Sequence, residues 1–236
     1  MNNLKKLGIS ALAGSLVAVS AQAGEISVSG SANVTMVTGE AANGNTGRSI
    51  GTDKDVSFTG SGELDNGWTF TVSTLLDDSY SVSSSYTSIT MGSMGTVSFG
   101  TDTGGASYKY DEEVPQAYEQ VSDAQQNSAN KIGDQMDSNM IVYNTPSFDL
   151  GGVSISGDLE YSFMAGGTAA GDGGSATYTE TYGEGVGAGI TATYDALKVG
   201  VYGAEIENKT PRTTGQDAVR DVFDGVWYAS YSFGPV

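Results

Sequence analysis

The chain has 236 residues, with 28 acidic and 10 basic side chains and neither Cys nor His. A formal net charge of −18 argues against nucleic acid as a partner, because binding it requires a basic face. The lack of Cys and His excludes thiol chemistry, disulfides, zinc sites and His-based acid–base catalysis. The length allows one sizeable domain.

The first 23 residues have the three parts of a cleaved secretory signal peptide. Lys5 and Lys6 form a basic start, an apolar run covers 7–19, and Ser20-Ala21-Gln22-Ala23 ends in a small-x-small cleavage pattern. The apolar run is shorter than the ~20 residues that a membrane-spanning helix needs. We therefore predict a signal peptide at 1–23, export from the cytoplasm, and a mature domain at 24–236.

The first predicted strand, over 26–36, alternates almost perfectly between apolar or small and polar residues. A period of two places one kind of side chain on each face of a strand. Its length is close to the roughly 9–11 residues of a tilted transmembrane strand. The next two predicted strands, over 55–63 and 68–73, repeat the pattern around Asp65-Asn66-Gly67, where Asn-Gly predicts a hairpin turn.

Later segments bring the prediction to about ten strands, at 84–91, 96–100, 139–145, 153–161, 186–194, 198–207 and 223–233. Connections after odd-numbered strands are expected to be mostly long and those after even-numbered strands short, as in bacterial outer-membrane barrels. Aromatic residues are expected near strand ends, where membrane barrels carry girdles. These are Trp68, Tyr143, Tyr161, Tyr194, Trp227, Tyr231 and Phe233.

The pattern predicts an all-β fold, a transmembrane antiparallel β-barrel. A soluble β-sandwich or β-solenoid also alternates, but all the apolar faces would then need covering. A barrel with lipid outside and water inside avoids this. A loop as long as 101–138 would overfill the lumen of a ten-stranded barrel, so we also expect further strands beyond Val236.

Four short segments resemble the general porins of Gram-negative bacteria, especially the alphaproteobacterial type. They are Gly24-Glu25-Ile26-Ser27-Val28-Ser29-Gly30, Gly62-Glu63-Leu64-Asp65-Asn66-Gly67-Trp68, Gly95-Thr96-Val97-Ser98-Phe99-Gly100 and Ser138-Asn139-Met140-Ile141-Val142-Tyr143. The resemblance implies a 16-stranded outer-membrane barrel, usually a homotrimer, for passive diffusion of small hydrophilic solutes. It also implies that the third outside loop, here 101–138, folds inward and constricts the pore.

That loop is strongly acidic, and carboxylates lining a narrow pore favour cations. We expect the constriction to include Asp102, Asp111, Glu112, Glu113 and Glu119. The predicted pore-lining residues on strands are Asp55, Glu63, Asp158 and Glu160. The basic wall cluster that the resemblance implies is nearly absent, since Lys198 is the one clear basic residue on a strand and Arg48 and Lys54 fall in or near the first loop. Asp111, Glu112 and Glu113 are also weak candidates for Ca²⁺, which prefers carboxylate oxygens.

Two enzyme-like patterns are discounted. Gly183, Gly185, Gly187 and Gly189 recur at every second residue, which places them on one face of a strand and not in a phosphate-binding loop. Ser128-Ala129-Asn130-Lys131 matches an acyl-transferase motif but lacks its companion motifs. We expect a channel and no enzyme, with no cofactor. The alternative function is an exported acidic β-rich adhesin or surface-layer protein that binds calcium or a partner.

Overall fold

The computed structural model describes residues 24–40, 46–101, 106–111, 113, 136, 139–165, 182–209 and 220–233. The predicted signal peptide at 1–23 lies outside these residues. The chain divides into two compact units, 1–83 and 84–236, and each is described by itself. No helix within the described ranges is long and apolar enough to cross a membrane.

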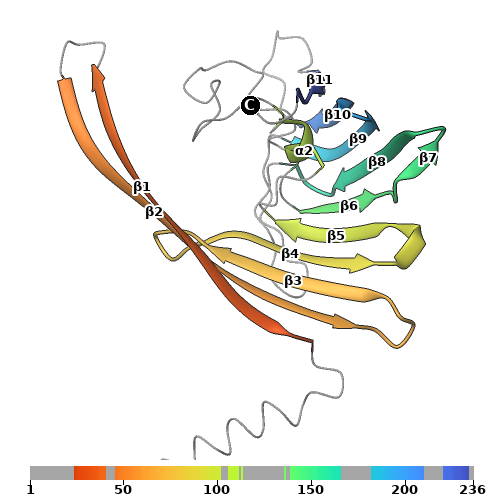
Figure 1. Cartoon of the computed structure of the whole chain (residues 1–236), viewed down its shortest axis with the longest axis horizontal. Coiled ribbons are helices and arrows are strands. Elements are labelled where there is room, and N and C mark those ends of the chain that lie inside the picture. The colour runs from red at the N-terminus through yellow and green to blue at the C-terminus, as the bar shows by residue number, and fades with distance from the viewer. Residues whose placement is uncertain are drawn as a thin grey trace, which may run out of the picture. The chain divides into compact units, whose positions relative to one another are not determined.

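The first unit contains three long antiparallel strands, β1 (Ile26–Glu40), β2 (Thr46–Glu63) and β3 (Thr69–Leu76). β1 pairs with β2 along its whole length, from Ile26 opposite Gly60 to Glu40 opposite Thr46. The alternation read from the sequence is preserved in this register, because Val28 lies opposite Phe58 on one face and Ser29 opposite Ser57 on the other. Figure 1 shows β1 and β2 as a long, curved ribbon.

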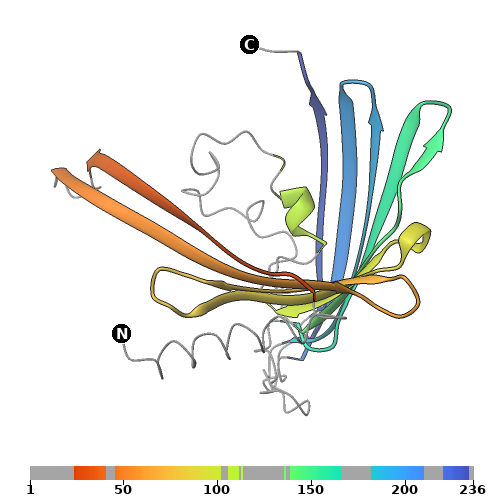
Figure 2. The same cartoon turned by 60° about the horizontal axis from the view of Figure 1, so that its bottom comes forward.

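The second unit is a single antiparallel sheet. Its strands are β4 (Val82–Thr90), β5 (Thr96–Thr101), β6 (Met140–Asn144), β7 (Phe148–Leu150), β8 (Val153–Ser162), β9 (Tyr182–Tyr194), β10 (Leu197–Asn208) and β11 (Val222–Tyr231). They run in the order β4-β5-β6-β8-β9-β10-β11, and β7 pairs with β8. A short 3₁₀ helix η1 (Gly92–Met94) joins β4 to β5, and α2 (Tyr108–Asp111) follows β5. Figure 2 shows α2 on one face of this sheet.

The strand count differs slightly from the prediction of about ten. Eleven strands form in the described residues, because the segment expected to be a plain connection before Val153 contains β7. The expected long first loop is also wrong. β2 already begins at Thr46, so Arg48 and Lys54 lie within a strand, opposite Thr38 and Ala32. Apart from Ile50, residues 46–54 are polar or glycine, which hides this strand from the sequence, but backbone pairing with β1 does not require alternation.

Two tight turns in the first unit have clear local causes. Between β2 and β3, Gly67 adopts φ 80° and the Asn66 carboxamide accepts the Trp68 amide at 3.1 Å. After β3, the Asp77 carboxylate accepts the amides of Ser79 and Ser81, both at 2.9 Å, and the Ser79 hydroxyl at 2.7 Å. These hydrogen bonds, led by that of the Ser79 hydroxyl, lower the pKa of Asp77. The connection after β3 is therefore a compact turn where the sequence predicted a long one.

Gly67→Val tests the first of these turns. A β-branched residue at φ 80° is strained, and we expect the substitution to destabilise the fold by about 1–3 kcal/mol. The measurement is the urea midpoint of the protein folded into lipid or detergent. Gly60→Val is the matched control, since Gly60 lies in β2 and has nothing within 4 Å of an added Cβ. Equal midpoints for the two variants would contradict a requirement for glycine at Gly67.

Candidate functional site

One face of β8–β11 exposes apolar side chains, and we call it the apolar face. Leu159, Ile190 and Val201 are 55%, 49% and 50% exposed, and Trp227 is 78% exposed. Their common face follows from the registers, because Leu159 lies opposite Ala188, Val201 opposite Ile190, and Trp227 opposite Val201. Large apolar side chains exposed over adjacent strands mark a surface that contacts lipid or another protein.

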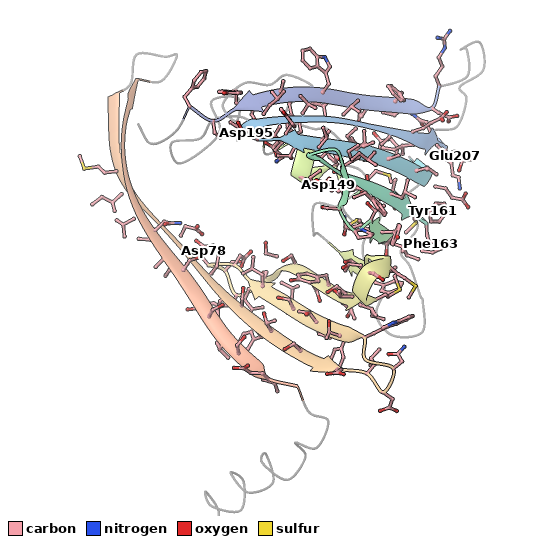
Figure 3. All side chains as sticks on the ribbon, turned by 45° about the vertical axis from the view of Figure 1, so that its right-hand side comes forward. Asp78, Asp149, Tyr161, Phe163, Asp195 and Glu207 are labelled. Carbon is pink, nitrogen blue, oxygen red and sulfur yellow. The ribbon has the colours of Figure 1, made fainter. Side chains whose placement is uncertain are left out.

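Aromatic rings mark both ends of the apolar face. At one end Tyr161 and Phe163 meet edge to face with centroids 4.9 Å apart, and at the other Tyr231 and Phe233 lie 4.8 Å apart. Figure 3 shows Tyr161 and Phe163 near Glu207, at the opposite end of the strands from Asp195. Eight residues of tilted β10 separate these levels, a height of roughly 20 Å, close to the ~25 Å apolar band of a membrane barrel.

One aromatic prediction was misplaced. Trp227 lies in the middle of β11, opposite Val201, and not near a strand end. β11 covers Val222–Tyr231, so Trp227 is five residues from its start and four from its end. The tryptophan therefore contributes to the middle of the apolar face, while Tyr231 and Tyr194 lie at its turn end.

The opposite face of β8–β11 is covered by part of the segment after β5, and we call it the loop face. Ala106, Ser107, Tyr110 and Met136 are 0–3% exposed. Of these, Ala106, Tyr110 and Met136 pack with Tyr202, Ala204 and Ile206 of β10 in the hydrophobic cluster of the unit. We call the sheet of β6 and β8–β11 the wall. The core of this unit lies between the wall and the segment that follows β5, and the side chains of the apolar face are not part of this core.

Two carboxylates of β8 lie beneath this segment. Asp158 and Glu160 are 1% and 3% exposed. They are two residues apart on one strand, so both project onto the loop face. A buried carboxylate needs hydrogen-bond donors or a cation to compensate for the loss of water.

Asp158 is fully supplied with donors. One carboxylate oxygen accepts the Lys109 ammonium at 2.7 Å and the Tyr110 hydroxyl at 2.5 Å, and the other accepts the Asn144 carboxamide at 2.7 Å. Burial first, and the hydrogen bond to Asp158 second, raise the pKa of the Tyr110 phenol. The hydroxyl therefore remains a donor at any physiological pH.

Glu160 is held by uncharged donors. One oxygen accepts the backbone amide of Ala106 at 2.6 Å, and the other accepts the hydroxyl of Tyr202 on β10. A second ion pair has its lysine on the sheet and its carboxylate on the segment, because Lys198 of β10 pairs with Glu113. Each side of the contact therefore supplies one lysine to a carboxylate of the other side.

Glycines and tyrosines provide the close fit. The Tyr110 ring stacks on Tyr202 with centroids 5.3 Å apart. It also lies over β9, where a Cβ atom on Gly189 would come within 3.0 Å of it. A Cβ on Gly185 would likewise meet Met136, and one on Gly187 would meet Glu160 and Tyr202. The prediction that these alternating glycines share one face of a strand is confirmed, and the absent side chains of Gly185 and Gly189 make room for Met136 and Tyr110 of the covering segment.

The predicted site residues fall into three groups. Asp158, Glu160 and Glu113 come together as described, with the β8 acids covered. Asp55 and Glu63 lie on the polar face of β2 in the first unit, Asp55 3.4 Å from the Ser31 hydroxyl and Glu63 exposed at the strand end. Asp102, Glu112 and Glu119 lie outside the described residues, as does the side chain of Asp111, the last residue of α2.

The described residues contain no group of three or more metal-ligating side chains. Glu113 is engaged with Lys198, and the calcium site remains a prediction.

Sequence reasoning missed the partners that complete the site, Lys109, Tyr110, Met136 and Tyr202. One signal was available. β10 alternates poorly because Tyr202, Ala204 and Ile206 make its loop face apolar. An apolar inner face on a strand with an apolar outer face indicates that protein covers it. The glycine run of β9 gives the same indication, since glycines permit close approach of another backbone or side chain.

An antiparallel sheet with an apolar band on one face, aromatic rings at both margins and a segment packed on the other face is typical of the wall of an outer-membrane channel. The chain belongs to the Gram-negative porin family, which matches residues 8–236. Membership gives an outer-membrane location and places the chain in a family of channels and not of enzymes. No curated protein matches the chain.

Proposed function

We propose that the protein is a diffusion channel for small hydrophilic solutes and ions, with segment 101–138 as its constriction and with a preference for cations. The observation that carries the proposal is the docking of Ala106, Tyr110 and Met136 on the loop face, opposite the apolar face. A segment held there narrows whatever space the wall encloses. The same family membership supports a homotrimer embedded in outer-membrane lipid and exported by the predicted signal peptide.

Charge pairing supports the cation preference. Among the residues that the structure describes, Lys109 and Lys198 are the two lysines of the loop-face contact, and each is paired with a carboxylate. Glu160 has no cationic partner among its described contacts, and Asp224 adds a further carboxylate on the same face of β11. The excess of carboxylates lowers the energy of a cation near this face and raises that of an anion.

The test is a planar-bilayer recording from the native outer-membrane protein under a KCl gradient. We expect stepwise openings and a reversal potential that corresponds to a several-fold preference for K⁺ over Cl⁻, decreasing as ionic strength rises and screening increases. A reversal potential favouring Cl⁻ would contradict the cation preference. Heat-modifiable, correctly folded protein that gives no conductance would contradict the channel itself.

A further inference from the structure

We infer that Asp158 and Glu160 are positioning residues, whose role is to fix the constricting segment against β8–β10 rather than to line open water. The inference rests on the proposed constriction and names the groups that set its geometry. Both carboxylates are almost fully buried, at 1% and 3% exposure. An ion in the pore therefore meets the covering segment, not these two groups.

The contacts of the two carboxylates are divided between the segment and the wall. Asp158 accepts hydrogen bonds from Lys109 and Tyr110 of the segment and from Asn144 of β6. Glu160 accepts hydrogen bonds from the Ala106 backbone amide of the segment and from the Tyr202 hydroxyl of β10. Each carboxylate is thus a bridge with donors on both sides, and removing it disconnects the segment at that point.

The two bridges hold opposite ends of one short stretch. Glu160 binds at Ala106 and Asp158 binds at Lys109 and Tyr110, so four consecutive peptide units are fixed at both ends. The Tyr110 ring is held further by stacking on Tyr202. Buried hydrogen bonds to charged groups are stronger than neutral ones and leave a costly unpaired donor when one partner is lost.

A general structural role would give a different result. Carboxylates needed only for the wall would, when neutralised, weaken folding and leave the pore of the surviving protein unchanged. Positioning carboxylates would leave the barrel folded, since the backbone pairings of β8 with β6 and β9 do not involve them. Loss of the two carboxylates would then make the residues packed under the segment more accessible to solvent and would change the conductance of the pore.

The experiment exploits the absence of Cys from the chain. Met136 belongs to the segment and is 0% exposed where it packs on the loop face, so Met136→Cys introduces one buried thiol as a reporter. The Asp158→Asn and Glu160→Gln changes are made together in this background. A small charged methanethiosulfonate then labels the thiol in folded protein, and single-channel conductance is recorded separately. Controls carry Glu184→Gln and Glu207→Gln, which remove two exposed carboxylates of β9 and β10.

We expect the double variant to react at least about tenfold faster than its parent, as loss of buried charged hydrogen bonds favours the open segment. Its channels should show more than one conductance level where the parent shows one. The control should match the parent in both readouts. Unchanged labelling and a single unchanged conductance level in the folded double variant would overturn the inference.

Two features keep the test decisive. Thiol labelling does not require ion flow, so a parent that fails to conduct but shows the labelling difference would refute the proposed channel and leave the positioning role standing. If the double variant fails to fold, Tyr202→Phe and Lys109→Met each remove one donor and keep both carboxylates. Both should then accelerate labelling by a smaller factor, and parental rates in both would overturn the inference.

Discussion

Val201→Arg is expected to prevent stable insertion of the folded protein into a bilayer. Val201 is 50% exposed on the apolar face, between Ile190 of β9 and Trp227 of β11. It lies four residues from the turn end of β10, about 10 Å along the membrane normal for a strand tilted by roughly 40°. That depth is near the middle of the apolar band, where an arginine facing lipid costs about 2–4 kcal/mol.

The measurement is folding into lipid vesicles, followed by heat-modifiable migration on a gel and by the urea midpoint. Ala196→Arg is the matched control, because Ala196 lies in the turn between β9 and β10 and, unlike Asp195, does not have a positive φ. An arginine at the membrane margin costs only about 0–1 kcal/mol. Equal folding yields and midpoints for the two variants would show that the apolar face does not contact lipid at Val201.

Strand positions were largely predictable because the membrane imposes a period of two on long strands. Val28 and Phe58 were placed on one face from the sequence alone, and the register pairs them directly. The Asn66-Gly67 turn was predictable because a positive φ strongly restricts the residue type. These signals are local, and each can be read within a window of a few residues.

The first hairpin was only partly predicted, because its distal half lacks that signal. Apart from Ile50, residues 46–54 are polar or glycine on both faces, yet they pair with β1 from Glu40 opposite Thr46 to Ala32 opposite Lys54. The pairing depends on backbone hydrogen bonds and on β1 as a template, neither of which changes side-chain periodicity. Arg48 and Lys54 were therefore assigned in or near a loop, although they lie in β2.

The loop-face contact could not be predicted from the sequence, because its ion pairs join residues 49 and 85 positions apart in the chain. Lys109 pairs with Asp158, and Lys198 with Glu113, across separations that no short motif encodes. Strand alternation placed Asp158 and Glu160 on one face of β8, which is the loop face, and their role in lining the pore stays a prediction. Their burial required knowing that Ala106 and Tyr110 cover them.

Gly189→Val is expected to displace the constricting segment from the wall. An added Cβ would come within 3.0 Å of the Tyr110 ring, and that ring is backed by Tyr202 and bonded to Asp158. Tyr110 cannot keep both contacts if it moves, and we expect a loss of roughly 1–3 kcal/mol of docking free energy from overpacking. β9 itself should remain intact, because valine is favoured in strands.

The readouts are single-channel conductance and labelling of the Met136→Cys thiol. Gly203→Val is the matched control, since Gly203 lies on the apolar face of β10 and an added Cβ meets only ordinary contacts at 3.4 Å and beyond. We expect faster labelling and altered conductance for Gly189→Val and parental values for Gly203→Val. If both variants behave like the parent, the position of the segment does not depend on glycine at Gly189 of β9. A change in Gly189→Val alone would show that the missing side chains of one strand set the position of the loop that covers it.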